Sequence, residues 1–523
     1  MKAKAISAAL LLSFFVAPVQ AQDIYKVQAL TDQDLNGTAR FVGMGGAMNA
    51  LGADLSTMAT NPAAIGLYRR NDFAVTGSFT SQPNGESFLD IDKSRASFDQ
   101  AGLVFKTNVD GNSLKFVNFG FNYQKRRNFK NFVGLDNVPT FGLSQTYTMA
   151  DMAYYRGVDL QTEQGYNSVP LFTGVGYDAG AILANRDASG NLDPNDPYTP
   201  LAADTYTLKR AQWGGLSQFD FSIGLNFDEQ IYAGVAFGLY DLNFHSAVDY
   251  LEFQHGYSEG YLFQNEEKLT GTGFDVKAGV ILRPIAESPF RIGLAIHTPT
   301  WYDLTYESYN FASVPDYSGS QVTFTEASDG IQPYDYKVRT PWKFSLAAAT
   351  TIANKVAIDA EYEYSDLSTC SVSYPDYDDW YSYGSGNRDY SLKDEMKACL
   401  KGQSTFRIGA EANVAPGFFV RAGYNYVSAP MKDDAYLNLL VDGQSSNYAS
   451  GTDFVNLGAI NRFTVGLGYR HKAFFADLAY QYQQQEGTVY AFRVYDDAWG
   501  QNLAGKKFDL NRNNFMLTLG FKF

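Results

Sequence analysis

The sequence predicts an all-β fold, a transmembrane antiparallel β-barrel of about 14 strands that spans the outer membrane of a Gram-negative type of cell. Three observations predict it: an export signal at the start, strands in which apolar and polar residues alternate, and connections that alternate between short and long. The predicted domains are a signal peptide (1–21), an N-terminal hatch inside the barrel (22–71) and the barrel itself (72–523).

The export signal begins with Lys2 and Lys4, and a mostly apolar stretch covers residues 5–16. Small residues, including Ala21, precede a cleavage point before Gln22. No later run approaches the ~20 apolar residues that a membrane-spanning helix needs. An exported chain of this kind crosses a membrane with strands.

Composition agrees with a barrel, because 39 Phe, 37 Tyr and 47 Gly accompany a mean hydropathy of −0.25. Barrel strands alternate lipid-facing apolar residues with lumen-facing polar ones, so no window is strongly hydrophobic. A net charge of −15 argues against nucleic acid as a partner, since that binding needs a basic surface. The four histidines show no metal-ligand spacing, so no metal and no cofactor are expected.

The alternation is most regular in residues 218–227, where every second residue is Phe, Ile or Leu. Fourteen such strand cores begin near residues 73, 100, 113, 217, 230, 272, 290, 341, 354, 404, 418, 461, 473 and 513. An even number is typical of bacterial single-chain barrels.

The connections between these cores sort by length. Short ones are 228–230, 284–288, 413–417 and 471–472, and long ones are 124–216, 242–271, 300–340, 365–403, 428–460 and 484–512. Short periplasmic turns and long external loops give this alternation, with both termini periplasmic. A soluble β-sandwich, the alternative, would not sort its loops by length.

Residues 22–71 are rich in Gly and Ala and show no alternation. About fifty such residues ahead of a barrel favour a hatch folded into the lumen, where irregular backbone is shielded from lipid. The alternative is a flexible periplasmic extension. Within this segment Asn61, Pro62 and Ala63 form a helix start, because Asn can cap free amides and Pro suits the first helical position.

The third strand contains a phase slip, because its apolar residues run Leu114, Phe116 and then Val117. A slip of this kind inserts one residue and predicts a bulge or kink at Phe116, Val117 and Asn118. Such a break either opens a lateral port or is an ordinary bulge near the rim of the barrel.

Cys370 and Cys399 lie in one polar segment and can form a disulfide in an oxidising compartment; the alternative is two free thiols. Residues 256–260 match the nucleophile-elbow pattern around Ser258, but they fall in a predicted loop, where the strand-to-helix context is missing. No enzymatic activity is therefore expected.

The last strand keeps one apolar phase up to Phe523. This looks like the terminal signal that the barrel assembly machinery recognises. The other expected surroundings of the barrel are outer-membrane lipid and lipopolysaccharide.

The whole mature chain resembles the FadL-type outer-membrane long-chain fatty acid transporters, a group that includes TodX-like transporters of hydrophobic compounds. The Gly-rich stretch 39–47, the Asn61-Pro62-Ala63 motif and the stretches 339–343 and 416–424 carry this resemblance, together with the strands that end at Phe523.

The resemblance implies a monomer whose hatch blocks the lumen. External loops capture a hydrophobic small molecule such as a long-chain fatty acid, which passes to an inner pocket and leaves sideways at the third strand. Asn61, Pro62 and Ala63, with Phe116, Val117 and Asn118, are then the expected binding or gating residues. The alternative function is a surface receptor or adhesin for a protein, a glycan or haem, with the barrel as its anchor.

Overall fold

The computed structural model describes residues 23–85, 88–89, 91–109, 113–254, 256–374, 387–440, 449–495 and 502–523. The predicted signal peptide, residues 1–21, lies outside the described residues. Within the described ranges, the helices are too short or too polar to cross a membrane.

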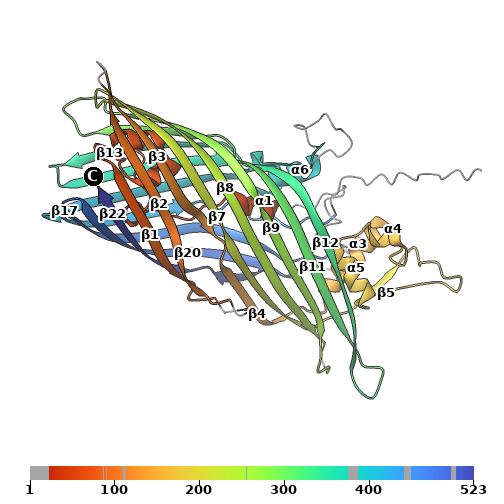
Figure 1. Cartoon of the computed structure of the whole chain (residues 1–523). Coiled ribbons are helices and arrows are strands. Elements are labelled where there is room, and N and C mark those ends of the chain that lie inside the picture. The colour runs from red at the N-terminus through yellow and green to blue at the C-terminus, as the bar shows by residue number, and fades with distance from the viewer. Residues whose placement is uncertain are drawn as a thin grey trace, which may run out of the picture.

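The strands close into one antiparallel barrel of fourteen strands, two of which are each divided into two segments (Figure 1). They are β1(Asp72–Ser81), β2(Ser94–Asn108), β3(Leu114–Asn128), β7(Thr205–Phe227), β8(Ile231–Phe253), β9(Tyr261–Leu282), β10(Arg291–His297) continued by β11(Trp301–Asp316), β12(Thr323–Arg339) continued by β13(Lys343–Ile352), β14(Val356–Asp366), β17(Gly402–Ala415), β18(Phe418–Val427), β19(Phe454–His471), β20(Phe474–Tyr490) and β22(Arg512–Lys522). The barrel closes where β1 pairs with β22, from Asp72 opposite Lys522 to Ser81 opposite Asn513. The predicted fold class is confirmed.

A belt of exposed apolar side chains surrounds the barrel. On β8 this belt runs from Ile231, which is 47% exposed, to Leu239, which is 40% exposed. The next outward residue is Asp241, and its neighbours in the same row are also polar: Ser217 on β7 and Thr272 on β9. This row marks one edge of the lipid-facing belt.

The height of the belt fits a membrane. Eight residue steps from Ile231 to Leu239 span about 27 Å of strand at ~3.4 Å each, and a tilt of about 40° reduces this to about 20 Å. The apolar band of outer-membrane barrels is about 25 Å tall. The chain is therefore a membrane-spanning barrel of the outer-membrane type.

The strands continue far beyond this edge, so two predicted long loops are largely strand. The predicted loop 242–271 is a β8–β9 hairpin connected by residues 254–260, and the predicted loop 300–340 is a β11–β12 hairpin connected by residues 317–322. The sequence prediction was wrong there because the phase inverts. Past Asp241 most of the outward side chains are polar and most of the inward ones are apolar.

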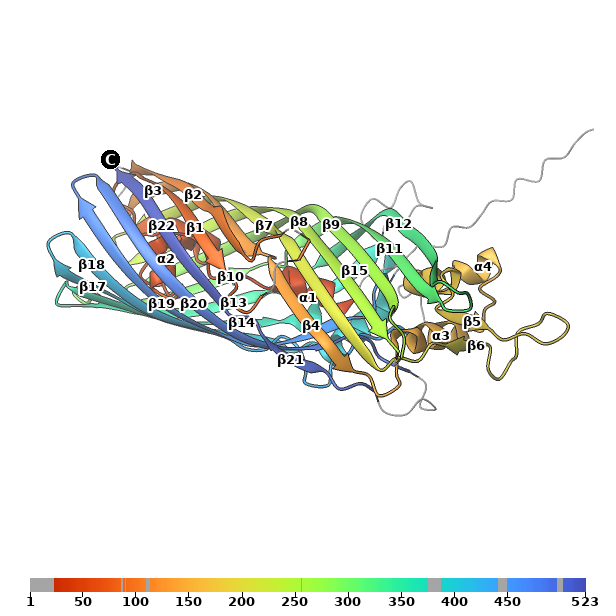
Figure 2. The same ribbon diagram turned by 90° about the horizontal axis from the view of Figure 1, so that it is seen from below.

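The long predicted loop 124–216 is also structured. It contains the end of β3, then β4(Asn131–Pro139), α3(Gln145–Arg156), α4(Glu163–Tyr166), α5(Leu171–Asp178), β5(Ile182–Ala184) and β6(Tyr198–Pro200), and then the start of β7. The helices lie at the end of the barrel where the long hairpins project (Figures 1 and 2). The other connecting elements are η3(Leu367–Thr369), β15(Ser371–Tyr374), β16(Asn387–Arg388), α6(Tyr390–Cys399) and β21(Lys506–Asp509).

The N-terminal segment, residues 23–71, is surrounded by the strands in both views (Figures 1 and 2). It contains α1(Ile24–Thr31), α2(Ala39–Gly43), η1(Leu55–Ala59) and η2(Pro62–Leu67). Its backbone approaches the wall at inward-facing glycines on several strands, where an added Cβ would overlap it: Gly234, Gly293, Gly409 and Gly423. Glycine is needed at these positions because the two backbones meet there.

Side chains of the wall also bind this segment. The Asn118 Nδ2 atom donates to the carbonyls of Ile65 (2.6 Å) and Tyr68 (3.2 Å). The Asp359 carboxylate accepts from the amides of residues 50 and 51, at 3.1 and 2.8 Å. Irregular backbone inside a barrel needs such partners, because no strand ladder satisfies it.

The ends of the described chain lie at different levels. Asn71 and Phe523 exchange backbone hydrogen bonds of 3.0 and 3.1 Å at the end of the barrel with the short turns. Asp23 instead lies inside the barrel beside Lys26, level with the projecting hairpins. That both chain termini are periplasmic stays a prediction.

Candidate functional site

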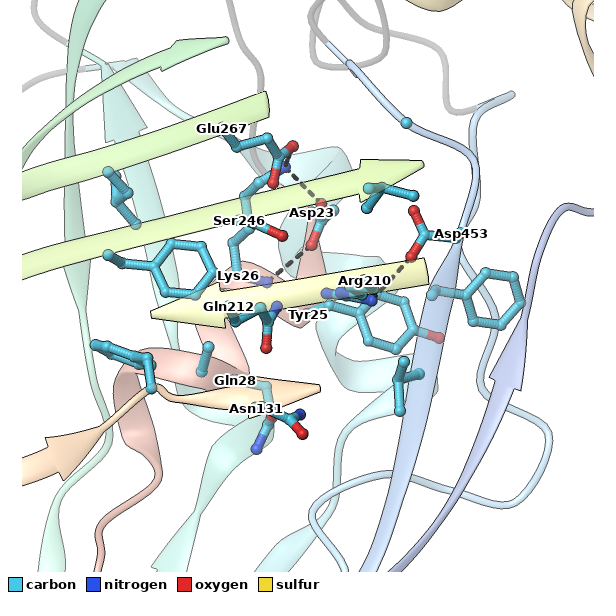
Figure 3. Close-up of a pocket in the computed structure, with 18 of the residues that line it drawn as sticks. Asp23, Tyr25, Lys26, Gln28, Asn131, Arg210, Gln212, Ser246, Glu267 and Asp453 are labelled. Atoms are coloured by element: carbon cyan, nitrogen blue, oxygen red, sulfur yellow. Dashed lines mark hydrogen bonds and ion pairs between the residues drawn. The ribbon is translucent and has the colours of Figure 1, made fainter. Parts of the chain in front are cut away.

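A cavity of about 120 Å³ lies between α1 and the inner faces of β4, β7, β8, β9 and β19 (Figure 3). Its lining includes Ser246 and Val248, which follow Asp241 along β8, so the cavity lies beyond the lipid-facing belt. The apolar part of the lining includes Leu30, Phe129, Val133, Leu242, Phe244, Val248, Leu269, Leu437, Phe454 and Leu457.

Helix α1 forms one wall of this cavity. Asp23 caps the helix by accepting from the Lys26 amide at 2.8 Å. Lys26 and Tyr25 line the cavity, and the Tyr25 hydroxyl donates to Asn456 Oδ1 at 2.9 Å. The opposite side of the helix, with Ile24, is buried in a hydrophobic cluster.

Most charged groups of the cavity are paired with one another (Figure 3), whereas Arg127 pairs with Asp32 outside the lining, at 3.1 Å. Lys26 Nζ lies 3.0 Å from Asp23 Oδ2 and 3.0 Å from Glu267 Oε1. Arg210 lies 2.9 Å from Asp453. Although burial opposes the charge on Lys26, the carboxylates of Asp23 and Glu267 raise the pKa of this ammonium group well above its usual range.

Size and lining define what the cavity accepts. An engineered apolar cavity of ~150 Å³ holds one benzene, so a space of about 120 Å³ takes a small ring or a short part of an alkyl chain. A longer apolar molecule enters only if α1 or the covering elements move. The paired charges at one side suit a ligand with an apolar body and a polar end.

The Asn61-Pro62-Ala63 motif has the local structure that the sequence predicts. The Asn61 Oδ1 atom accepts from the Ala63 amide at 3.1 Å, and Pro62 is the first residue of η2. The Asn61 side chain also donates to the Asn49 carbonyl at 2.8 Å. The motif packs against the inward glycines of β8 and β9, and none of its residues lines the cavity.

The third strand is bulged but continuous. In the β3–β7 pair the register shifts between Leu114 and Phe116, next to the predicted position. The β2–β3 ladder is unbroken from Phe116 opposite Asn108 to Gln124 opposite Gln100. Of the predicted gating residues, Phe116 and Val117 are thus paired wall residues, and Asn118 binds the N-terminal segment.

The two cysteines are free thiols in the structure, which is the alternative to a disulfide. Cys370 and Cys399 are both buried, and both belong to the hydrophobic cluster that includes Ile24 and Leu367. Ser258 lies between two strands, β8 and β9, rather than at a strand-to-helix turn.

Sequence reasoning missed the charged lining of the cavity. Lys26 lay in a segment without a pattern, while Arg210 and Glu267 lay in stretches assigned to loops. One signal was present: from Leu242 to Tyr250 the inward positions of β8 are mostly apolar and buried. An apolar inner face outside the membrane indicates an enclosed space.

Neither a family model nor a curated protein matches the chain. Solved structures of FadL-type outer-membrane transporters resemble it along nearly the whole length. A FadL homologue of Pseudomonas aeruginosa has a TM-score of 0.49 at 11% identity, covering 97% of this chain and 100% of its own.

Two toluene transporters are similar to the chain at the same level. TbuX of Ralstonia pickettii has a TM-score of 0.46 at 13% identity and covers 94% of this chain and 99% of its own. TodX of Pseudomonas putida has a TM-score of 0.45 at 10% identity and covers 97% of this chain and 100% of its own. Likenesses of this size fix neither a substrate nor a mechanism, and the barrel architecture rests on the strand pairing itself.

Proposed function

We propose that this chain is a passive uptake channel for hydrophobic small molecules, with long-chain fatty acids as its substrate class. The observation that carries the proposal is a partly apolar cavity enclosed by α1, within a barrel whose lumen residues 23–71 occupy. A filled lumen is not an open pore. Passage therefore requires movement of this segment. We call residues 22–71 the hatch.

The proposed orientation places the short turns and Phe523 in the periplasm and the long hairpins outside the cell. The hairpins capture the ligand, the cavity receives it, and displacement of the hatch releases it sideways into the membrane. A closed barrel leaves no sheet edge in the membrane, so the functional unit is a monomer among outer-membrane lipid and lipopolysaccharide. The exposed terminal Phe523 is the contact for the barrel assembly machinery.

The charge pairs couple binding to hatch movement. Lys26 is held by one carboxylate of its own segment, Asp23, and by one of the wall, Glu267. A fatty acid carboxylate that reaches Lys26 competes with the Glu267 contact. Losing that contact frees α1 from β9, and the cavity can then expand around the alkyl chain.

The test is calorimetric binding of oleate to the folded, delipidated protein, beside a hatch variant with Asn61→Ala and Pro62→Ala. We expect saturable binding by the unaltered chain and weaker binding by the variant, because the hatch then holds α1 less firmly in place. Absence of binding by a correctly folded barrel would refute the transport proposal.

The segment 141–203 at the end of the barrel, which we call the cap, gives a reason to test the receptor alternative as well. It exposes large aromatic side chains, with Phe141 87% and Tyr155 49% exposed. Replacing residues 141–203 with a short linker removes these side chains. Oleate binding that survives this deletion supports the channel, whereas a barrel that adheres to surfaces only with its cap, and binds no lipid, supports the receptor.

A further inference from the structure

Two neighbouring strands of the barrel wall are interrupted at positions that lie opposite each other. Pro299 and Pro341 stand opposite each other, between the His297–Lys343 pair and the pair of Trp301 with Arg339. Proline has no N–H group, so neither residue donates to the ladder. At this point one barrel strand is divided into β10 and β11, and its neighbour into β12 and β13.

The next ladder stops altogether. β13 pairs with β14 as far as Lys343 opposite Ser365, and pairing resumes between β12 and β15 with Arg339 opposite Ser371. Residues 340–342 therefore face residues 366–370 without a backbone hydrogen bond between the two stretches, all of which the structure describes. We call these two facing stretches the seam.

Several polar groups of the seam have hydrogen-bond partners that do not cross it. The Asp366 carboxylate accepts from the Ser368 amide at 3.1 Å and from its hydroxyl at 2.7 Å. The Thr340 amide donates to the Thr300 carbonyl at 3.1 Å, on the far side from the seam. Backbone at membrane depth is tolerated only when it is satisfied in this way. Separating the two sides of the seam breaks no ladder bond.

The seam lies at the edge of the lipid-facing belt. Arg339 pairs with Trp301, Trp301 with Phe274, and Phe274 with Leu239, the last apolar residue of the belt on β8. Trp342 of the seam is 41% exposed on the outer surface. A molecule that passes the seam thus enters the membrane directly, at the depth where a polar end group and an apolar chain are both accommodated.

On the inner side, the seam faces the hatch. Helix α6 packs against η3, and α1 packs against α6. A small space of about 20 Å³ between the end of α1 and the wall is lined by Leu30, Thr31, Thr340 and Lys343. The same helix therefore separates the seam on one side from the cavity on the other.

The third strand is not interrupted at the predicted position, Phe116–Asn118, and its ladder with β2 ends only at Gln124, opposite Gln100. Its ladder with β2 is continuous through Val117, which lies opposite Thr107. Its ladder with β7 continues from Phe116 to Lys125 with one hydrogen-bonded register. An opening at Phe116–Asn118 would break ladder bonds inside the membrane, where their groups find no other partner.

We propose that the seam between residues 340–342 and 366–370 is the lateral exit of the channel, and that α1 and α6 keep it closed. The inference rests on the proposed uptake function and specifies its last step. A long-chain fatty acid in the cavity displaces α1, slides past its former position, and leaves through the seam into the outer membrane.

Two engineered disulfides, which we call staples, test the exit. Arg339→Cys with Ser371→Cys joins the rim at the outer end of the seam, and Lys343→Cys with Ser365→Cys joins the other rim. Each pair stands directly opposite in an antiparallel ladder, where Cβ atoms are ~5 Å apart and a disulfide can form with small adjustments. Both variants carry Cys370→Ser and Cys399→Ser, so only the staple can form.

The matched control staples the third strand instead, with Thr107→Cys and Val117→Cys in the same cysteine-free background. Two readouts are taken for every variant, oxidised and reduced. One is uptake of radiolabelled oleate by Gram-negative cells without their own fatty acid uptake, and the other is calorimetric oleate binding by the purified protein.

We expect the seam staples to abolish uptake while binding persists, reduction to restore uptake, and the third-strand staple to leave uptake intact. Unchanged uptake with both seam staples, or uptake lost with the third-strand staple alone, would overturn the exit. Absence of both binding and uptake in the unstapled cysteine-free chain and in the unaltered one would overturn the uptake function, and the exit with it.

Discussion

Replacing Lys26 by methionine should detach α1 from the barrel wall. The ammonium group lies 3.0 Å from both Asp23 and Glu267 and 4.9 Å from the ring centre of Tyr306. Its side chain is 12% exposed and that of Glu267 is 13% exposed. The substitution therefore leaves a nearly buried carboxylate without its cation.

The size of the expected loss in local stability depends on the hydrogen-bond partners that Glu267 keeps in Lys26→Met. Breaking one side of a buried ion pair costs about 3–5 kcal/mol. Glu267 still accepts hydrogen bonds from the Ser450 and Tyr306 hydroxyls, at 2.6 and 2.8 Å, so we expect the lower end of that range. A local loss of about 3 kcal/mol corresponds to roughly a hundredfold more frequent opening of α1.

The assay is hydrogen exchange of the α1 amides in the folded barrel. We expect their exchange to accelerate by about two orders of magnitude in Lys26→Met, while the amides of β8 stay protected. The companion variant Lys26→Met/Glu267→Gln should recover most of the protection, because it removes the more deeply buried of the two carboxylates, and the remaining one, Asp23, is 24% exposed. Unchanged α1 exchange in the single variant would refute the view that this pair fastens the helix.

Two further predictions concern the hatch contacts and helix α6. Gly234→Val should lower the temperature at which the folded barrel unfolds in SDS gels, because the new side chain meets Pro62, whereas Gly77→Ala, with only one contact at 3.5 Å, should not. Burial, with neighbouring carboxylates, raises the pKa of Glu395 in α6 from 4.5 to about 8, so its stabilising neutral form is fully present below pH 4.5 and is lost as pH rises through about 8. A spin label at Lys397→Cys should gain mobility across this range, and Glu395→Gln should remove the pH dependence; a label equally mobile at both ends would contradict this assignment.

The part of the fold that the lipid belt controls was predictable. Outward residues between Phe219 and Phe227 must be apolar and inward ones polar or small, so alternation locates each strand. The same rule failed past Asp241, where water lies outside the barrel and an enclosed apolar space inside. The sequence still alternates there, but in the opposite phase, and the lengths of β8 and β9 were therefore underestimated.

The candidate site was less predictable, because its residues meet only through the closed barrel. Lys26 and Glu267 are separated by 241 positions in the chain (267 − 26) and share no local pattern. The slip at Phe116 correctly indicated a bulge, but a bulge adds a residue without ending the ladder. The interruption at the seam was marked by Pro299 and Pro341, since proline inside a barrel strand removes a ladder donor.

The most direct test of the central claim is oleate binding to the delipidated barrel with its cavity open or filled. Val248→Phe adds a ring to the lining, and Val235→Phe adds the same ring to the lipid-facing surface as its control. The account predicts saturable binding that Val248→Phe weakens strongly and Val235→Phe leaves unchanged. Binding unaffected by the filled cavity, or no binding by any folded sample, would contradict it.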